Sequence, residues 1–312
     1  MLQIFVNANY DFVGKRRWFY LASGGLMLLS LVWIFFVGGL NYGIDFTGGA
    51  LIQVRYDKPA SVDLVRRGLD EIKLGNAIIQ QFGDVQEYLI RLPQGGEKPD
   101  QLSKQVQDIL SKVAGARVEI RRIEFVGPQV GRDLQLQALY AVLAGMAGIL
   151  IYVALRFHFR DGVISVAAIA HDVVVTLGAL SVTQREMSLP VLAALLTIVG
   201  YSINDTIVVF DRIRESRGKG FRKGQTPGEL VNAAVNQTLS RTLLTAFTTF
   251  LAALILFIYG GEVLRDFAFA LAVGVVIGTY SSIAAGSLVM DWETWSRVRA
   301  RAGGKAPAKA KA

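Results

Sequence analysis

Long apolar runs, separated by short polar segments, dominate the pattern of this chain. The first run covers residues 18–40 and follows three basic residues at 15–17. Five more runs lie at about residues 136–155, 162–182, 189–210, 239–260 and 267–288. An α-helix needs about 20 mostly apolar residues to cross the hydrocarbon of a bilayer. The pattern therefore predicts an α-helical polytopic membrane protein with six transmembrane helices.

The first run could also be read as a signal peptide, which has a similar basic start and apolar core. This run is too long for one, and the sequence LNYG at residues 40–43 is a poor small-residue cleavage site. We therefore interpret residues 18–40 as a retained transmembrane helix.

A polar stretch, residues 41–132, separates the first run from the second. Apolar and polar residues alternate in four short segments, which predicts strands at 50–56, 77–82, 87–92 and 117–125. Capping residues Ser61 and Asp100 precede apolar residues at helical spacing, which predicts one helix up to about residue 72 and a second after Asp100. The order βαββαβ predicts a ferredoxin-like α+β domain between transmembrane helices 1 and 2.

Charge places these segments relative to the membrane. The net charge is +8, and the basic residues gather at both ends of the chain and in the loops after the second and fourth runs. Basic loops face the cytoplasm, so both termini are expected there and the α+β domain in the periplasm. The basic balance is ascribed to this orientation and to membrane lipid, with no nucleic acid as a partner.

Five segments follow from these patterns. We expect a cytoplasmic N-terminus at 1–17, transmembrane helix 1 at 18–40, the periplasmic domain at 41–132, transmembrane helices 2–6 at 133–290 and a basic cytoplasmic tail at 291–312. The composition agrees with a membrane protein, since 52% of the residues are hydrophobic and 19% are charged. Soluble domains have about 25% charged residues.

Ionisable residues within the apolar runs are the candidate functional residues. Asp205 lies well inside the fourth run, and Asp172 lies near the middle of the third beside His171. Arg241 is a buried cation if the fifth helix begins at the capping sequence TPGE, residues 226–229, and an interfacial residue if it begins later. We expect Asp205, Arg241 and Asp172 to gather around one polar cavity.

Two interpretations fit such a group. A static buried ion pair would fix how the helices pack. A proton relay would instead use Asp205 as a group that takes up and releases a proton as Arg241 approaches and retreats. Intramembrane carboxylates favour the relay. Asp211 and Arg212 lie at the end of the same run, where anchoring at the interface is expected, and His171 is interpreted as a packing residue.

The sequence offers little to support an enzyme. It has no cysteine, which excludes disulfides and thiolate metal sites. It contains no phosphate-binding loop and no HExxH or GxSxG motif. We therefore expect no catalytic residues, no metal and no cofactor.

Two longer motifs resemble a known family. The sequences LNYGIDFTGG at 40–49 and GYSINDTIVVFDRIRE at 200–215 closely resemble the SecF family of the bacterial protein-export machinery. The resemblance covers nearly the whole chain. It implies a location in the bacterial inner membrane and a bundle similar to that of resistance-nodulation-division transporters.

The resemblance also implies partners and roles. SecF proteins pair with SecD, work with the SecYEG channel and use the proton gradient to help move the translocating preprotein. The positions that match the family's proton pathway are Asp205 and Arg241. The remaining motif residues are expected to have structural or coupling roles: Asp45, Gly48, Gly49, Asn204, Asp211 and Arg212.

Three other classes of protein each fit part of the sequence. An intramembrane aspartyl protease needs two facing carboxylates and a GxGD-type motif, which is absent. A proton-coupled exporter of small molecules would use Asp205, but six spans form half of such a transporter. A passive scaffold of the channel would account for the outer domain but not for the buried charge.

Overall fold

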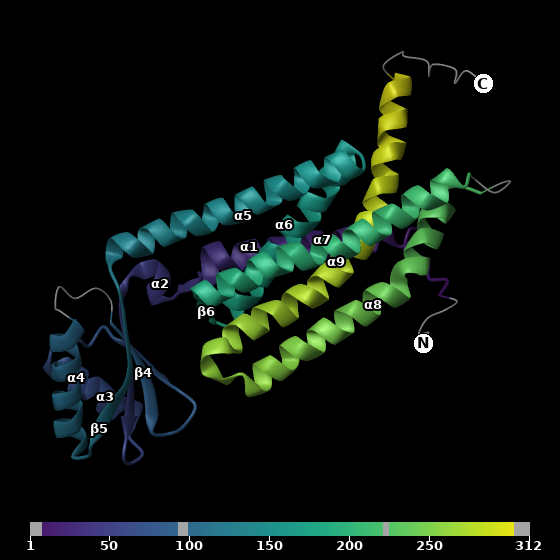
Figure 1. The fold of residues 1–312 in the computed structure, drawn as a ribbon. Coiled ribbons are helices and arrows are strands. Elements are labelled where there is room, and N and C mark those ends of the chain that lie inside the picture. Colours follow the sequence, from purple (N-terminus) through teal and green to yellow (C-terminus); the bar gives the residue numbers. More distant parts are fainter. Residues whose placement is uncertain (1–7, 93–98, 221–224, 303–312) are drawn as a thin grey trace.

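A computed structural model describes residues 8–92, 99–220 and 225–302 of the 312-residue chain. It consists of a helix bundle with a small α/β domain at one end (Figure 1). Within the described residues, six helices are long and apolar enough to cross a membrane. They are α1 (Arg16–Val32, continued by a π-helical turn at Trp33–Val37), α5 (Pro128–Arg156), α6 (Phe159–Val182), α7 (Leu189–Gly218), α8 (Pro227–Tyr259) and α9 (Gly261–Ala302).

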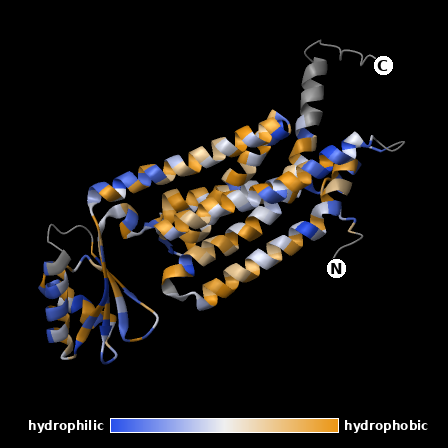
Figure 2. Ribbon diagram, viewed as in Figure 1, coloured by the Kyte–Doolittle hydropathy of each residue, from blue (hydrophilic) through white to orange (hydrophobic). Residues whose placement is uncertain are grey.

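Hydrophobic residues predominate along the helices of the bundle, whereas hydrophilic residues are frequent in the α/β domain (Figure 2). Helices α6, α7 and α9 form the interior, with half or more of their apolar windows buried, and α1, α5 and α8 surround them. Close packing in the interior depends on small residues. A Cβ atom on Gly274 of α9 would lie 2.2 Å from Cδ1 of Ile198 on α7, so glycine lets these helices approach.

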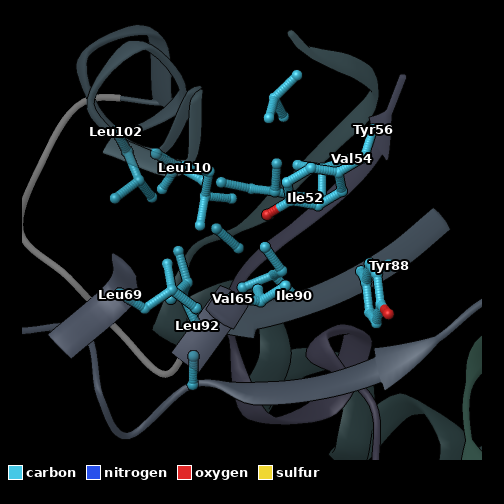
Figure 3. Packing of buried hydrophobic residues seen from close by; sticks show 14 residues of the cluster. Ile52, Val54, Tyr56, Val65, Leu69, Tyr88, Ile90, Leu92, Leu102 and Leu110 are labelled. Carbon is cyan, nitrogen blue, oxygen red and sulfur yellow. The ribbon is translucent and has the colours of Figure 1, made fainter. Parts of the chain in front are cut away.

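The α/β domain contains four strands and two helices in the predicted order. They are β2 (Gly49–Tyr56), α3 (Val62–Glu71), β3 (Ile78–Gln81), β4 (Glu87–Leu92), α4 (Pro99–Ala114) and β5 (Val118–Val126). The sheet is antiparallel with the order β3-β4-β2-β5. Alternate strand residues such as Ile52 and Ile90 point toward Leu69 and Leu110 of the helices, and all four are fully buried (Figure 3). Both helices therefore cover the same face of the sheet.

Three short elements join the domain to the bundle, and the hydrophobic pattern did not predict them. Strand β1 (Asn41–Tyr42) pairs in parallel with β6 (Glu186–Met187), which lies between α6 and α7. Helix α2 (Ile44–Thr47) follows β1. Elements of two to four residues are too short to produce a periodic signal.

The ends of the bundle away from the sheet also differ in detail from the predicted segments. Helix α9 continues to Ala302, so residues 291–302 of the predicted tail extend this helix. Arg16 at the start of α1 forms an ion pair of 3.0 Å with Asp291 of α9. The start of α1 and this part of α9 therefore lie at the same end of the bundle. Residues 1–7 and 303–312 of the predicted terminal segments lie outside the described residues.

Candidate functional site

Asp205 lies near the middle of α7 and is 2% exposed. Its Oδ2 atom is buried and makes no hydrogen bond. The hydroxyl groups of Tyr201, one turn earlier on α7, and of Thr242 on α8 are also buried. Asp205 is therefore a carboxylate held in an apolar interior with one oxygen free to accept or release a proton.

Arg241 occupies the corresponding position near the middle of α8, because this helix begins at Pro227. Thr226 and Glu229 form a capping box there, as the early-start interpretation required. Arg241 lies close enough for Coulombic attraction to Asp205, but the two side chains form no ion pair among the described residues. The Arg241 side chain is exposed on the bundle surface. The structure therefore places the pair on neighbouring helices without direct contact.

The exposed side of Arg241 borders a groove of about 490 Å³ between α5, α7 and α8. Asp211 and Arg212 of α7 line the same groove. Asp211 accepts a hydrogen bond of 2.6 Å from Arg214, and Arg212 donates one of 2.6 Å to Gln237 of α8. These contacts fit the anchoring role expected of both residues.

Asp172 on α6 belongs to a different set of contacts. It is 0% exposed, and its Oδ2 atom accepts hydrogen bonds from Ser202 of α7 at 2.6 Å and Ser281 of α9 at 2.8 Å. Its Oδ1 atom lies 3.0 Å from Nδ1 of His171. Asp172 therefore joins the three interior helices. Ser202, which contacts Asp172, lies one turn before Asp205 on α7.

Asp45 lies in the first matched motif, and its contact connects that motif to α7. Its Oδ2 atom accepts a 2.8 Å hydrogen bond from the backbone N–H of Leu189, the first residue of α7. Ser188 makes no side-chain cap, and Pro190, which follows Leu189, has no N–H to offer. Asp45 therefore supplies the cap of the helix that carries Asp205, and its charge also suits the positive end of the helix dipole.

Gly48 and Gly49 form the turn that leads from this motif into the sheet. Both have positive φ angles, +72° and +125°, which glycine adopts readily. A Cβ atom on Gly48 would also lie 3.0 Å from Cα of Pro128 at the start of α5. Backbone conformation and close packing both require glycine at position 48. Asn204 of the second motif is exposed on the surface of α7.

A charged contact between the domain and the bundle was not predicted. Arg91 of β4, in the sheet, forms an ion pair with Glu186 of β6. On the bundle side, Asp266 of α9 accepts hydrogen bonds from the Glu186 backbone and from the Arg185 side chain. Burial raises the pKa of Glu186, the Arg91 guanidinium lowers it, and the nearby Asp266 and Asp45 carboxylates raise it. The net effect is a pKa above the ordinary value for glutamate.

Together these features define a multi-pass membrane protein in which an α/β domain is fastened to a six-helix bundle that carries buried carboxylates. Residues 105–295 match the family model described as "Protein export membrane protein SecD/SecF, C-terminal", and residues 33–60 match "SecD/SecF GG Motif". The chain belongs to the SecD/SecF family of protein-export membrane proteins.

Named relatives agree with this assignment. The protein translocase subunit SecF of Calditerrivibrio nitroreducens is 45% identical over 279 residues, which cover 89% of this chain and 91% of the relative. The same subunit of Escherichia coli O157:H7 is 42% identical, with 88% and 84% covered. Homology at this level over most of both chains places the protein among multi-pass proteins of the bacterial inner membrane.

A solved structure shares the fold. The crystal structure of SecDF from Thermus thermophilus, described as a translocon-associated membrane protein, is 41% identical with a TM-score of 0.82. It is matched over 93% of this chain but only 39% of its own length. This chain therefore corresponds to about two fifths of the SecDF polypeptide, and the remainder of that architecture lies outside it.

Proposed function

We propose that this chain is a SecF-type subunit of the Sec protein-export machinery. With SecD, it uses the proton motive force to assist the translocation of preproteins across the cytoplasmic membrane. The observation that carries the proposal is Asp205, a carboxylate 2% exposed with one unpartnered oxygen, near the middle of a membrane-length helix.

The energetics of Asp205 favour a working proton site. A charged aspartate at the centre of a membrane helix costs from about 2.5 kcal/mol upward, and binding a proton removes that cost. Attraction from Arg241 acts in the opposite direction and favours the charged form. A small movement of α8 relative to α7 therefore changes the proton affinity of Asp205. Each proton crossing 100 mV supplies about 2.3 kcal/mol.

The surface of the bundle supports SecD as the partner. The exposed side of α7 carries a seam of small or polar residues, Ala193, Thr197, Gly200 and Asn204. Small residues at this spacing let a second helix approach closely. Arg241 is exposed near the middle of the neighbouring α8. A guanidinium facing lipid at that depth is costly, so a second subunit covering this face would stabilise the bundle.

The α/β domain supports a role outside the membrane. Its βαββαβ order and the sheet order β3-β4-β2-β5 support a ferredoxin-like fold. The basic loops favour a cytoplasmic position for both termini and a periplasmic one for this domain. There it would meet the preprotein emerging from SecYEG. Asp45 and the Arg91–Glu186 pair would transmit its position to α7 and the rest of the bundle.

An export assay tests the proposal. Cells depleted of their own SecF receive this chain with its SecD, and secretion of a reporter preprotein is compared between wild type and Asp205→Asn. The change keeps the shape and removes the titratable charge. We expect slower export that no longer responds to collapse of the proton gradient, with normal membrane levels and SecD association. Asp133→Asn, at an exposed position near the start of α5, is the matched control.

Unchanged export by Asp205→Asn would refute the proton role. The chain would then assist export as a scaffold, and Asp205 would serve helix packing.

A further inference from the structure

The packing interpretation of His171 does not explain its surroundings. The residue is 7% exposed on α6, and its Nδ1 atom lies 3.0 Å from Oδ1 of Asp172. Its other ring nitrogen, Nε2, is buried and makes no hydrogen bond. A residue retained for hydrogen-bonded packing would use both nitrogens, because an unpaired buried polar atom costs about 1–3 kcal/mol.

The buried carboxylate of Asp172 has no lysine or arginine to balance its negative charge among the described residues. Three side chains direct polar atoms at its carboxylate: His171, Ser202 and Ser281. Donors of this kind stabilise the ionised form. Among the described residues, no lysine or arginine forms an ion pair with Asp172, and the sole ion-pair candidate is His171. A buried carboxylate without a counter-charge is strongly disfavoured.

We propose that His171 and Asp172 form a second proton-binding site in the bundle, in which one proton held at Nε2 of His171 neutralises the buried carboxylate. Nδ1–H donates to Asp172, so Nε2 is the atom that gains and loses the proton. The pair carries a charge of −1 without this proton and is neutral with it. Its role in export rests on the proposed function above, whereas its proton binding does not.

The groups around the pair come from three other helices. The Tyr280 ring of α9 lies 6.5 Å from the His171 ring between centroids, and its hydroxyl is hydrogen-bonded to the Phe19 carbonyl and to Ser23 of α1. From α7, Ser202 contacts Asp172, and the titratable Asp205 lies one turn further along. The pair therefore lies between α1 and the helix that carries Asp205.

The chain contains two histidines, so the proposal can be tested directly. The full chain is labelled with ¹⁵N-histidine, placed in phosphatidylethanolamine–phosphatidylglycerol nanodiscs and titrated by solid-state NMR, which distinguishes neutral from doubly protonated imidazole. His158, at the start of α6, has a 69% exposed side chain and serves as the internal reference. The His158→Gln variant then leaves one signal, from His171.

We expect the His171 signal to change between the doubly protonated and the neutral form during the titration. Asp172→Asn removes the neighbouring carboxylate and should move this change to a different pH. A His171 signal that stays neutral from pH 5 to 8 in the His158→Gln protein would overturn the proposal. A titration unaffected by Asp172→Asn, in protein with an unchanged backbone spectrum, would overturn the pairing.

The export role is tested separately with His171→Gln and with His158→Gln as the control. Slower export whose pH profile is altered by His171→Gln alone supports the second site. Equal export by both variants overturns its role in coupling, even where the NMR titration shows the proton. A different result would refute the proposed function alone. In that case Asp205→Asn would leave export unchanged while the His171 NMR signal still showed proton binding.

Discussion

The contact between Asp45 and Leu189 predicts that the beginning of α7 is stabilised by a residue 144 positions away in the sequence. Replacing Asp45 with alanine removes both the acceptor of the Leu189 N–H and a negative charge at the helix N-terminus. Loss of a capping side chain costs about 1 kcal/mol, and loss of the charge adds about 0.3–1 kcal/mol. Asp45→Asn keeps an acceptor and loses only the charge.

Hydrogen exchange measured by mass spectrometry on the full chain in nanodiscs reports this local stability. A loss of about 1 kcal/mol corresponds to roughly fivefold faster opening, so the combined loss should make peptides covering the first turns of α7 exchange about nine to thirty times faster in Asp45→Ala. Asp45→Asn should show a smaller increase. Asp57→Ala, at an exposed position in the same domain, should leave α7 unchanged. Equal exchange in wild type and Asp45→Ala would show that the cap is not energetically significant.

Two further predictions concern the junction between the domain and the bundle. The folded-state pKa of Glu186 lies above its ordinary value, so its stabilising contribution is greatest below the ordinary glutamate pKa and is lost as pH rises through the folded-state pKa. The thermal unfolding temperature in detergent should therefore fall with rising pH more for wild type than for Glu186→Gln. Equal pH dependence of the two unfolding temperatures would contradict this. Gly48→Ala should lower the free energy of unfolding by about 1–2 kcal/mol or more, from positive φ and contact with Pro128. Gly25→Ala, in α1 with open space around it, should be neutral or stabilising.

The sequence was sufficient to predict the large elements because their signals are local. Twenty-residue apolar runs identify membrane helices regardless of what packs around them. The alternation in 50–56 and 87–92 likewise predicted β2 and β4, which pair in the sheet. The capping sequence at 226–229 marked the true start of α8, well before its apolar run.

The candidate site was predicted less completely because its contacts join distant residues. Asp172 meets Ser202 and Ser281, which lie 30 and 109 positions away. Serine within an apolar helix has no pattern that identifies its partner. The Arg91–Glu186 pair depends on the position of the α/β domain relative to the bundle. Hydrophobic periodicity along the sequence does not predict that position. The exposed position of Arg241 could not be predicted either, since the rotation of α8 is set by its packing against α7 and α9.

Exposure of Arg241 and Asn204 on one face of the bundle has a consequence for how cells produce this protein. A copy without its partner would hold an arginine and an asparagine against lipid, where both are disfavoured. Such orphan subunits are less stable and more open to membrane proteases than assembled ones. Balanced synthesis of the two subunits would then be favoured, with surplus copies removed by degradation.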